Sequence, residues 1–146
     1  MTLKQIDKAI ASWMAVRGVF FLRISLAVVF IWFGALKPFG VSPADDLVAK
    51  TVYWVDPEWF LPVLGVWEVL IGICMLWRPL IRVSIALRAL QMPGTFLPLV
   101  ILPDVCFVHI PWAPTLEGQY IIKNLVLISA AIVIGGTLRG NRPAPT

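Results

Sequence analysis

The chain has 146 residues, of which 60% are hydrophobic and only 14% are charged, and its mean hydropathy is +0.89. A soluble domain carries roughly 25% charged residues, so this composition excludes an ordinary soluble protein and indicates an integral membrane protein. The net charge of +4 does not point to nucleic acid, because the basic residues cluster at predicted helix ends rather than in one basic patch.

Apolar segments predict an all-α fold, an integral membrane four-helix bundle that forms one transmembrane domain over residues 1–146. A spanning helix needs about 20 apolar residues, and the four spans are expected at about residues 17–37, 57–77, 80–102 and 118–138. Residues 1–16 place Leu3, Ile6, Ile10 and Trp13 on one face. That pattern is typical of a short helix on the membrane surface, although a frayed extension of the first span would explain it equally well.

The first outer loop carries its own helix signals. Ser42-Pro43 followed by Asp45 and Asp46 resembles a helix start, with a capping serine and acids in the first turn. Apolar residues then recur at helical spacing up to Val55, which predicts a short amphipathic helix over the mouth of the bundle. Asp56-Pro57-Glu58 repeats the start signal and opens the second span.

The third span combines a polar seam with two prolines. Ser84, Arg88, Gln91 and Thr95 recur at spacings of four, three and four, so they share one helical face. Pro93 and Pro98 interrupt the helical hydrogen bonds. This interruption either only shapes the packing or frees backbone groups that need other partners.

Cysteine and histidine give little support for a redox centre within the chain. Cys74 and Cys106 do not form a Cys-x-x-Cys motif, and His109 is the one histidine. No metal site and no intrinsic cofactor are therefore expected. Cys106 is expected in a loop on the oxidising side, either as an unreactive thiol or as a thiol able to pair with a partner.

Basic residues predict how the chain is oriented. They gather at one set of helix ends, whereas most acids lie at the other set. The positive-inside rule then places both termini of this multi-pass membrane protein on the cytoplasmic side. The basic residues at the predicted inner ends are Lys4, Lys8, Arg17, Arg78, Arg82, Arg139 and Arg142.

Buried charge is the most informative feature of the sequence. Glu68 lies near the middle of the second span, where an unpaired carboxylate is costly. Counting 1.5 Å per residue from the helix ends brings it close in depth to Arg23, Arg88 and Gln91. The candidate ligand-binding residues are Arg23, Lys37, Glu68, Arg88, Gln91, Lys123 and Asn124.

Two interpretations of these charges remain open. In the first, Glu68 and Arg88 form a structural pair, while Arg23 and Lys37 extend to the two membrane interfaces. In the second, the cluster binds the polar head of a membrane-soluble molecule such as a quinone, or a small anion, because the cations outnumber the acid. The second interpretation predicts that Glu68→Gln abolishes function while the protein still accumulates.

Three segments resemble the DoxX-like membrane proteins. They are FFLRISLAVVFIWFGALK from Phe20, LGVWEVLIG around Glu68, and EGQYIIKNLVLISAA from Glu117, and the first also resembles the related reactive-chlorine-resistance proteins. The resemblance implies a four-helix membrane bundle in the inner (plasma) membrane of a bacterium. It also implies a membrane subunit of a redox or oxidative-stress complex, such as thiosulfate:quinone oxidoreductase. The matched positions that it marks as candidates are Arg23, Lys37, Glu68, Lys123 and Asn124.

The leading functional hypothesis is therefore a membrane subunit in redox or oxidative-stress chemistry. It would contact membrane lipid, bind quinone at the polar cluster and share catalysis with a soluble redox partner. Two alternatives stay open: a non-enzymatic anchor or assembly factor for a soluble partner, and a small transporter, which would need a homo-oligomer to form a pathway.

Overall fold

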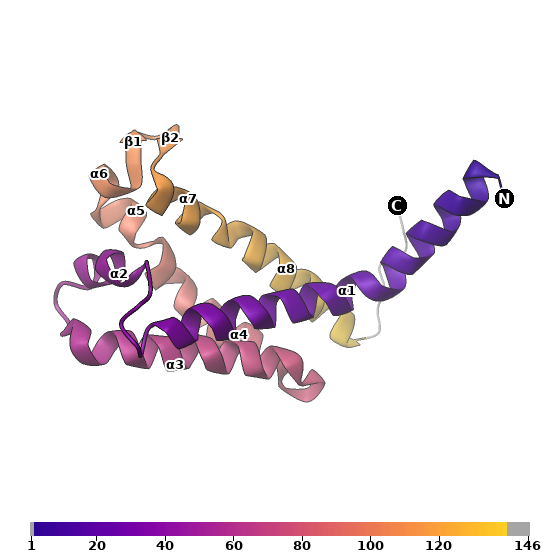
Figure 1. Cartoon of the computed structure of the whole chain (residues 1–146), viewed down its shortest axis with the longest axis horizontal. Coiled ribbons are helices and arrows are strands. Elements are labelled where there is room, and N and C mark those ends of the chain that lie inside the picture. Colours follow the sequence, from indigo (N-terminus) through magenta and orange to yellow (C-terminus); the bar gives the residue numbers. More distant parts are fainter. Residues whose placement is uncertain (1, 140–146) are drawn as a thin grey trace.

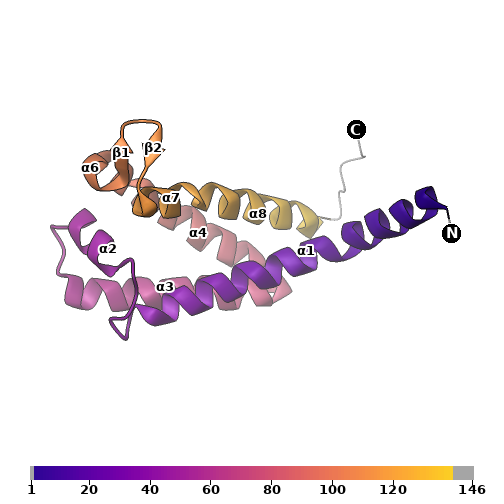
Figure 2. The same cartoon turned by 45° about the horizontal axis from the view of Figure 1, so that its top comes forward.

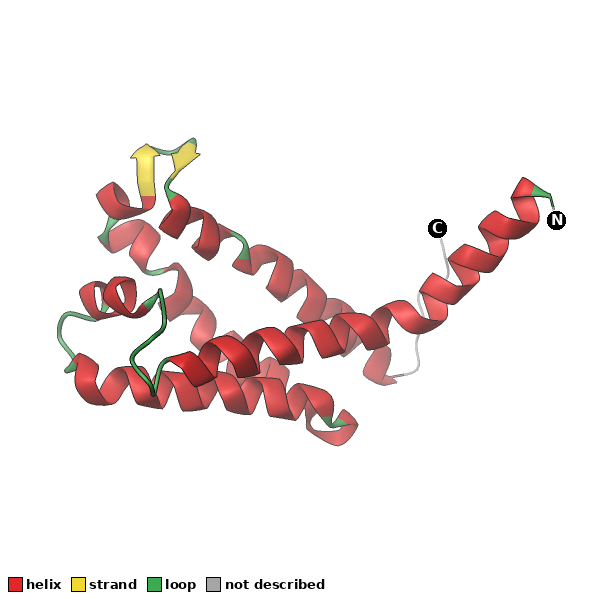
Figure 3. Ribbon diagram, viewed as in Figure 1, coloured by secondary structure: helices red, strands yellow, loops and turns green. Residues whose placement is uncertain are grey.

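The computed structural model describes residues 2–139, so the predicted inner-end residue Arg142 lies outside the described part of the chain. Figures 1 and 3 show an almost entirely helical molecule. Within the described residues, four helical segments are long and apolar enough to cross a membrane. The predicted all-α membrane bundle is thus confirmed. The four segments are Leu3–Phe39, Pro57–Leu76, Arg78–Ile101 and Leu116–Gly136.

The first helix, α1 (Leu3–Leu36), is longer than a bilayer requires. Its 34 residues correspond to about 51 Å at 1.5 Å per residue, whereas the hydrocarbon core is about 30 Å thick. Its N-terminal turns extend beyond the other helices (Figure 2). Residues 3–16 therefore do not form a separate surface helix; they extend the first span, and the extension is fully helical rather than frayed.

Helix α1 packs closely on the second span, α3 (Pro57–Leu76), through three glycines. A Cβ added to Gly65 would lie 2.6 Å from the carbonyl oxygen of Gly34, and one added to Gly72 would lie 2.8 Å from that of Ala27. Small residues permit such close approach of two backbones within a membrane. The glycines thereby fix the register, with Gly34 beside Gly65 and Ala27 beside Gly72.

The first outer loop contains the predicted short helix, α2 (Asp45–Thr51), but its start was placed wrongly. The Ser42 hydroxyl accepts a hydrogen bond from the amide of Ala44 at 3.3 Å, so it closes a local turn and the helix begins two residues later. The start of α3 is as predicted, because the Asp56 carboxylate caps it by accepting from the amide of Glu58 at 3.0 Å.

The third span is interrupted, as its prolines predict. The 3-10 turn η1 (Arg78–Leu80) leads into α4 (Ile81–Phe96), which continues through Pro93. A second helix, α5 (Pro98–Ile101), follows after Leu97. Pro98 begins this short helix, where its missing amide hydrogen leaves no intrahelical bond unmade.

The second outer loop is more ordered than the sequence indicates. It folds into α6 (Pro103–Cys106) and an antiparallel hairpin of β1 (Phe107–His109) and β2 (Ala113–Pro114). Gly118, at the start of the fourth span, packs against this unit, since a Cβ there would clash with the carbonyl oxygen of Cys106.

The fourth span consists of α7 (Leu116–Ile122) and α8 (Asn124–Gly136), with a break at Lys123, and ends in η2 (Thr137–Arg139). Buried apolar residues occupy the half of the bundle that contains the α3–α4 turn. The other half, which lies next to α2 and the hairpin and is called the outer half after the predicted orientation, holds the polar residues instead. The core residues are Leu26, Ala27, Phe30, Ile71, Met75, Ile81, Ala130 and Ile134.

Cys106 is expected to resist alkylation. Its side chain is fully buried and unpaired, and burial together with the Glu117 carboxylate raises the pKa of the Cys106 thiol. A raised pKa lowers the fraction of reactive thiolate at pH 8 relative to an ordinary cysteine. In a Cys74→Ser background, a water-soluble maleimide should label Cys106 slowly at pH 8 and faster as the pH rises further. Asp104→Cys, at an exposed position of α6, is the fast-labelling control, and equal rates would contradict the burial.

Candidate functional site

The central acid, Glu68, pairs with Lys37 from α1. Lys37 Nζ lies 2.5 Å from Glu68 Oε2, and the Lys37 side chain is only 6% exposed. Lys37 follows the last residue of α1, and the Gly34–Gly65 contact brings this helix end against α3. Lys37 therefore does not extend to the outer interface, which corrects one part of the structural interpretation.

Gln91 connects Glu68 to Arg88 through its side-chain amide. Its Nε2 donates to Glu68 Oε1 at 2.9 Å, and its Oε1 accepts from Arg88 Nη1 at 3.5 Å. Both residues lie on the predicted polar seam of α4, one turn apart. The amide thus spans the gap between the acid of α3 and the guanidinium of α4.

Among residues 2–139, Arg88 has no acid partner, so the Glu68–Arg88 pair of the structural interpretation is wrong. Across residues 2–139, the Lys37–Glu68 contact is the one salt bridge. Arg88 donates through Nη2 to Asn124 Oδ1, and its guanidinium lies 4.8 Å from the ring centroid of Phe30. Only 4% of Arg88 is exposed, and its Nε has no hydrogen-bond partner. Neutral amides and an aromatic face thus surround this buried cation.

Asn124 is held in place by the break in the fourth span. Its Nδ2 donates to the carbonyl oxygens of Tyr120 and Ile121 at 3.0 and 3.1 Å, which satisfies backbone groups near the break. Its Oδ1 is then free to accept from Arg88. Lys123, at the break itself, is exposed, and its Nζ lies 5.4 Å from the ring centroid of Tyr120.

Arg23 lies apart from the other candidates. The glycine contacts place Ala27 beside Gly72. From that level, Arg23 lies toward one end of the bundle and Glu68 toward the other. Each is four residues away, which separates them by about 12 Å along the bundle axis. Arg23 is half-buried, and the nearest aromatic face is that of Phe20, 5.9 Å from its guanidinium. The sequence-based estimate of depth, counted from the expected helix ends, missed this offset because α1 is much longer than a bilayer is thick.

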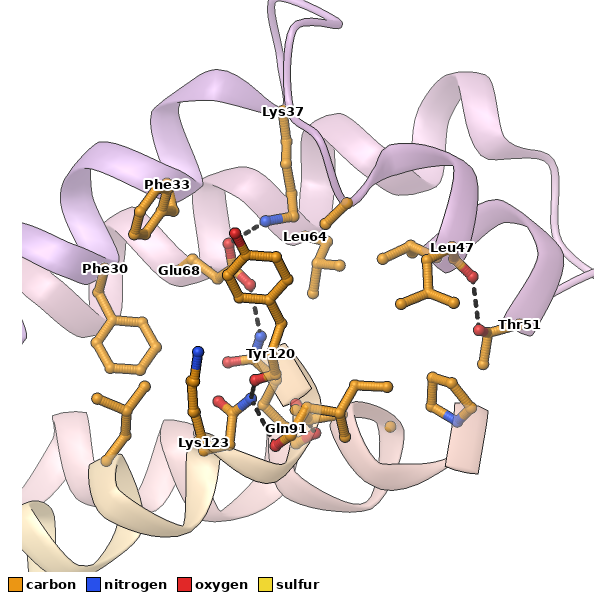
Figure 4. Close-up of a pocket in the computed structure, with 18 of the residues that line it drawn as sticks. Phe30, Phe33, Lys37, Leu47, Thr51, Leu64, Glu68, Gln91, Tyr120 and Lys123 are labelled. Atoms are coloured by element: carbon orange, nitrogen blue, oxygen red, sulfur yellow. Dashed lines mark hydrogen bonds and ion pairs between the residues drawn. The ribbon is translucent and has the colours of Figure 1, made fainter. Parts of the chain in front are cut away.

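The remaining six candidates line one cavity of about 600 Å³ in the outer half of the bundle. Figure 4 shows the polar groups in its middle, with Phe30 and Phe33 on one side and Leu47 and Thr51 on the other. Helix α2 covers this second side, which agrees with its predicted position over the mouth of the bundle. The cavity is lined by Val29, Phe30, Phe33, Lys37, Ala44, Leu47, Val48, Thr51, Val52, Phe60, Leu64, Glu68, Arg88, Gln91, Gly94, Thr95, Pro98, Tyr120, Ile121, Lys123, Asn124, Val126 and Leu127.

Several lining residues were not among the sequence-based candidates. Phe30 and Tyr120 each place a ring against a cation, and Phe33 and Leu64 form apolar wall. The spacing of Phe30 and Tyr120 could have indicated them as lining residues. Phe30 lies seven residues before Lys37, and Tyr120 lies three residues before Lys123, so each shares a helical face with a candidate lysine. The apolar wall residues could not have been found in this way. Nothing in the sequence of a membrane protein distinguishes an apolar side chain that lines a cavity from one that faces lipid.

No protein-family model, curated protein or solved structure matches this chain. The site must therefore be interpreted from its own chemistry. In the described part of the chain, no group of three or more histidine, cysteine, aspartate or glutamate side chains is arranged to hold a metal. What the cavity offers is an apolar volume of ligand size, hydrogen-bond donors and an excess of positive charge.

Proposed function

We propose that this protein binds the polar head of a membrane-soluble molecule, a quinone, in the outer cavity. It would act as a membrane subunit in redox or oxidative-stress chemistry. We also propose that it lies in the bacterial inner membrane, which the DoxX-like resemblance implies, with both termini in the cytoplasm, which the distribution of basic residues favours. The DoxX-like resemblance supports the same role, and a soluble partner would exchange electrons with the bound quinone.

The cavity is the observation that carries this proposal. It lies within the membrane-spanning helices, and its walls are mostly apolar, so it suits a molecule that arrives from the lipid. Quinone carbonyl oxygens accept hydrogen bonds, and Lys123 is an exposed donor at the cavity that has no carboxylate partner among residues 2–139. A volume of about 600 Å³ falls in the range of about 300–1,000 Å³ that is usual for small-molecule sites.

Native mass spectrometry of the protein, extracted gently from its own membrane, tests the proposal directly. A quinone retained by the wild-type protein supports it. An empty protein, or one that carries only phospholipid, contradicts it. Turnover of a quinone pool with added soluble fraction would then show whether the bound molecule is used in redox chemistry.

Filling the cavity should remove the ligand without unfolding the protein. Gly94 lines the cavity, and a Cβ at this position meets no atom within 4 Å. Gly94→Phe should therefore be tolerated, yet it should lower quinone occupancy at least about tenfold by occupying ligand volume. Gly136→Phe is the matched control, since its Cβ is equally free and Gly136 does not line the cavity. Equal occupancy in both variants would place the ligand elsewhere.

A second candidate function, anchoring a soluble partner, is favoured by α1. Its N-terminal turns extend beyond the bundle and expose the apolar residues Leu3, Ile6 and Ile10 (Figure 1). The same mass-spectrometry experiment separates the two functions. A stoichiometric protein partner with an empty cavity would favour the anchor, and its loss on deletion of residues 2–12 would locate the contact.

A further inference from the structure

Positive charge exceeds negative charge along the cavity wall. Of the residues that line it, Lys37, Arg88 and Lys123 are basic, and Glu68 is acidic. Both oxygens of Glu68 are already engaged, Oε2 by Lys37 and Oε1 by the amide of Gln91. Glu68 therefore offers no free oxygen to either of the other two cations.

Arg88 is a fixed source of positive potential in the cavity wall. It is held by the side-chain oxygens of Asn124 and Gln91 and by the ring of Phe30, all of them neutral. The Glu68 carboxylate acts on this guanidinium only across the Gln91 amide, and a buried cation without a direct acid contact is costly within a membrane. An anion in the cavity would lower that cost.

Lys123 is positioned to contact such an anion. It lies at the break between α7 and α8, and Figure 4 shows its ammonium directed into the space between Phe30 and Tyr120. Its ammonium has an aromatic face beside it and no acid partner within residues 2–139. The group can therefore form a charge-assisted hydrogen bond without breaking an existing ion pair.

We infer that the ligand is an amphiphile with an anionic head, which binds at Lys123 within the field of Arg88 while its tail lies along the apolar walls. A carboxylate, a phosphate ester or a quinol with a deprotonated ring hydroxyl shares this chemistry. A free inorganic anion would leave Phe33, Leu64 and the apolar face of α2 without a partner. The inference rests on the proposed function only in that a membrane-soluble molecule occupies the cavity.

Three probes with the same 14-carbon chain test the role of charge. Binding of myristate, myristyl phosphate and myristyl alcohol is measured by native mass spectrometry on the full chain in nanodiscs of zwitterionic lipid. Both anions should bind at least about tenfold more tightly than the alcohol, and the tighter anion identifies the kind of head. Equal binding of the alcohol would overturn the inference.

Lys123→Gln tests the contact itself. This variant should weaken myristate binding about tenfold and leave alcohol binding unchanged, and Lys123→Arg should retain most of the affinity. Lys50→Gln is the matched control, because Lys50 is an exposed cation of α2 that does not line the cavity. An equal loss of myristate affinity in Lys123→Gln and Lys50→Gln would show that the effect comes from general surface charge, and it would overturn the inference.

Competition with a neutral quinone separates this inference from the proposed function. If quinone binds and the anions do not, the inference fails and the quinone role stands. If the anions bind at Lys123 and quinone neither binds nor competes, the quinone role fails and the inference stands.

Discussion

Glu68→Leu is expected to lower the free energy of unfolding by about 3–5 kcal/mol, as is usual when one partner of a buried ion pair is removed. The substitution leaves Lys37, which is only 6% exposed, without its acid. It also removes the acceptor for Gln91. Reversible unfolding in mixed detergent micelles, followed by circular dichroism, measures the change.

The double variant Lys37→Met/Glu68→Leu is the control for this experiment. It replaces both charges with apolar side chains of similar size, so it should recover most of the lost stability. A single Glu68→Leu variant as stable as the wild type would show that Lys37 escapes to the membrane interface, and the buried pair would then contribute nothing to folding. Glu68→Gln keeps the shape of the side chain, so its free energy of unfolding should lie between those of Glu68→Leu and the wild type.

Gly65→Ala is expected to destabilise the bundle by about 3 kcal/mol, at the upper end of the usual cost of overpacking. The added Cβ would lie 2.6 Å from the carbonyl oxygen of Gly34 and 2.9 Å from the Cβ of Lys37. The first of these neighbours is backbone, so α1 and α3 must separate. Separation would also lengthen the Lys37–Glu68 contact.

Unfolding in the same micelles measures the Gly65→Ala effect. Gly136→Ala is the control, since its Cβ would meet no atom within 4 Å and alanine favours the helix. The control should be neutral or slightly stabilising. Equal stability of the two variants would show that α1 and α3 do not pack through this glycine contact.

Helix positions followed from the sequence wherever the local chemistry is strong. Apolar length predicted the four spans, and the Asp56-Pro57-Glu58 signal placed the start of α3. The hairpin after α6 was missed because β1 and β2 are held by pairing and by Gly118 packing rather than by an alternating pattern. Similarly, the Ser42-Pro43 signal closes a turn instead of capping α2.

Membership of the polar cluster was easier to predict than its pairing. Six of the seven candidate residues line one cavity, because polar side chains in apolar helices gather away from lipid. Which acid meets which base depends on the register between helices, and the glycine contacts of Gly34, Gly65 and Gly72 set that register. The sequence shows these glycines but not which residues they face, and so Arg88 was assigned the partner that belongs to Lys37.

During synthesis, Lys37 leaves the ribosome 31 residues before Glu68. Until Glu68 follows, Lys37 can only extend toward the membrane surface, as a lysine near a helix end can. Both charges and all three packing glycines lie between Gly34 and Gly72, so the contacts that join α1 to α3 need no residue of α4. Helix α4 then adds the Gln91 amide to Glu68, and the cavity is complete only when Asn124 reaches Arg88.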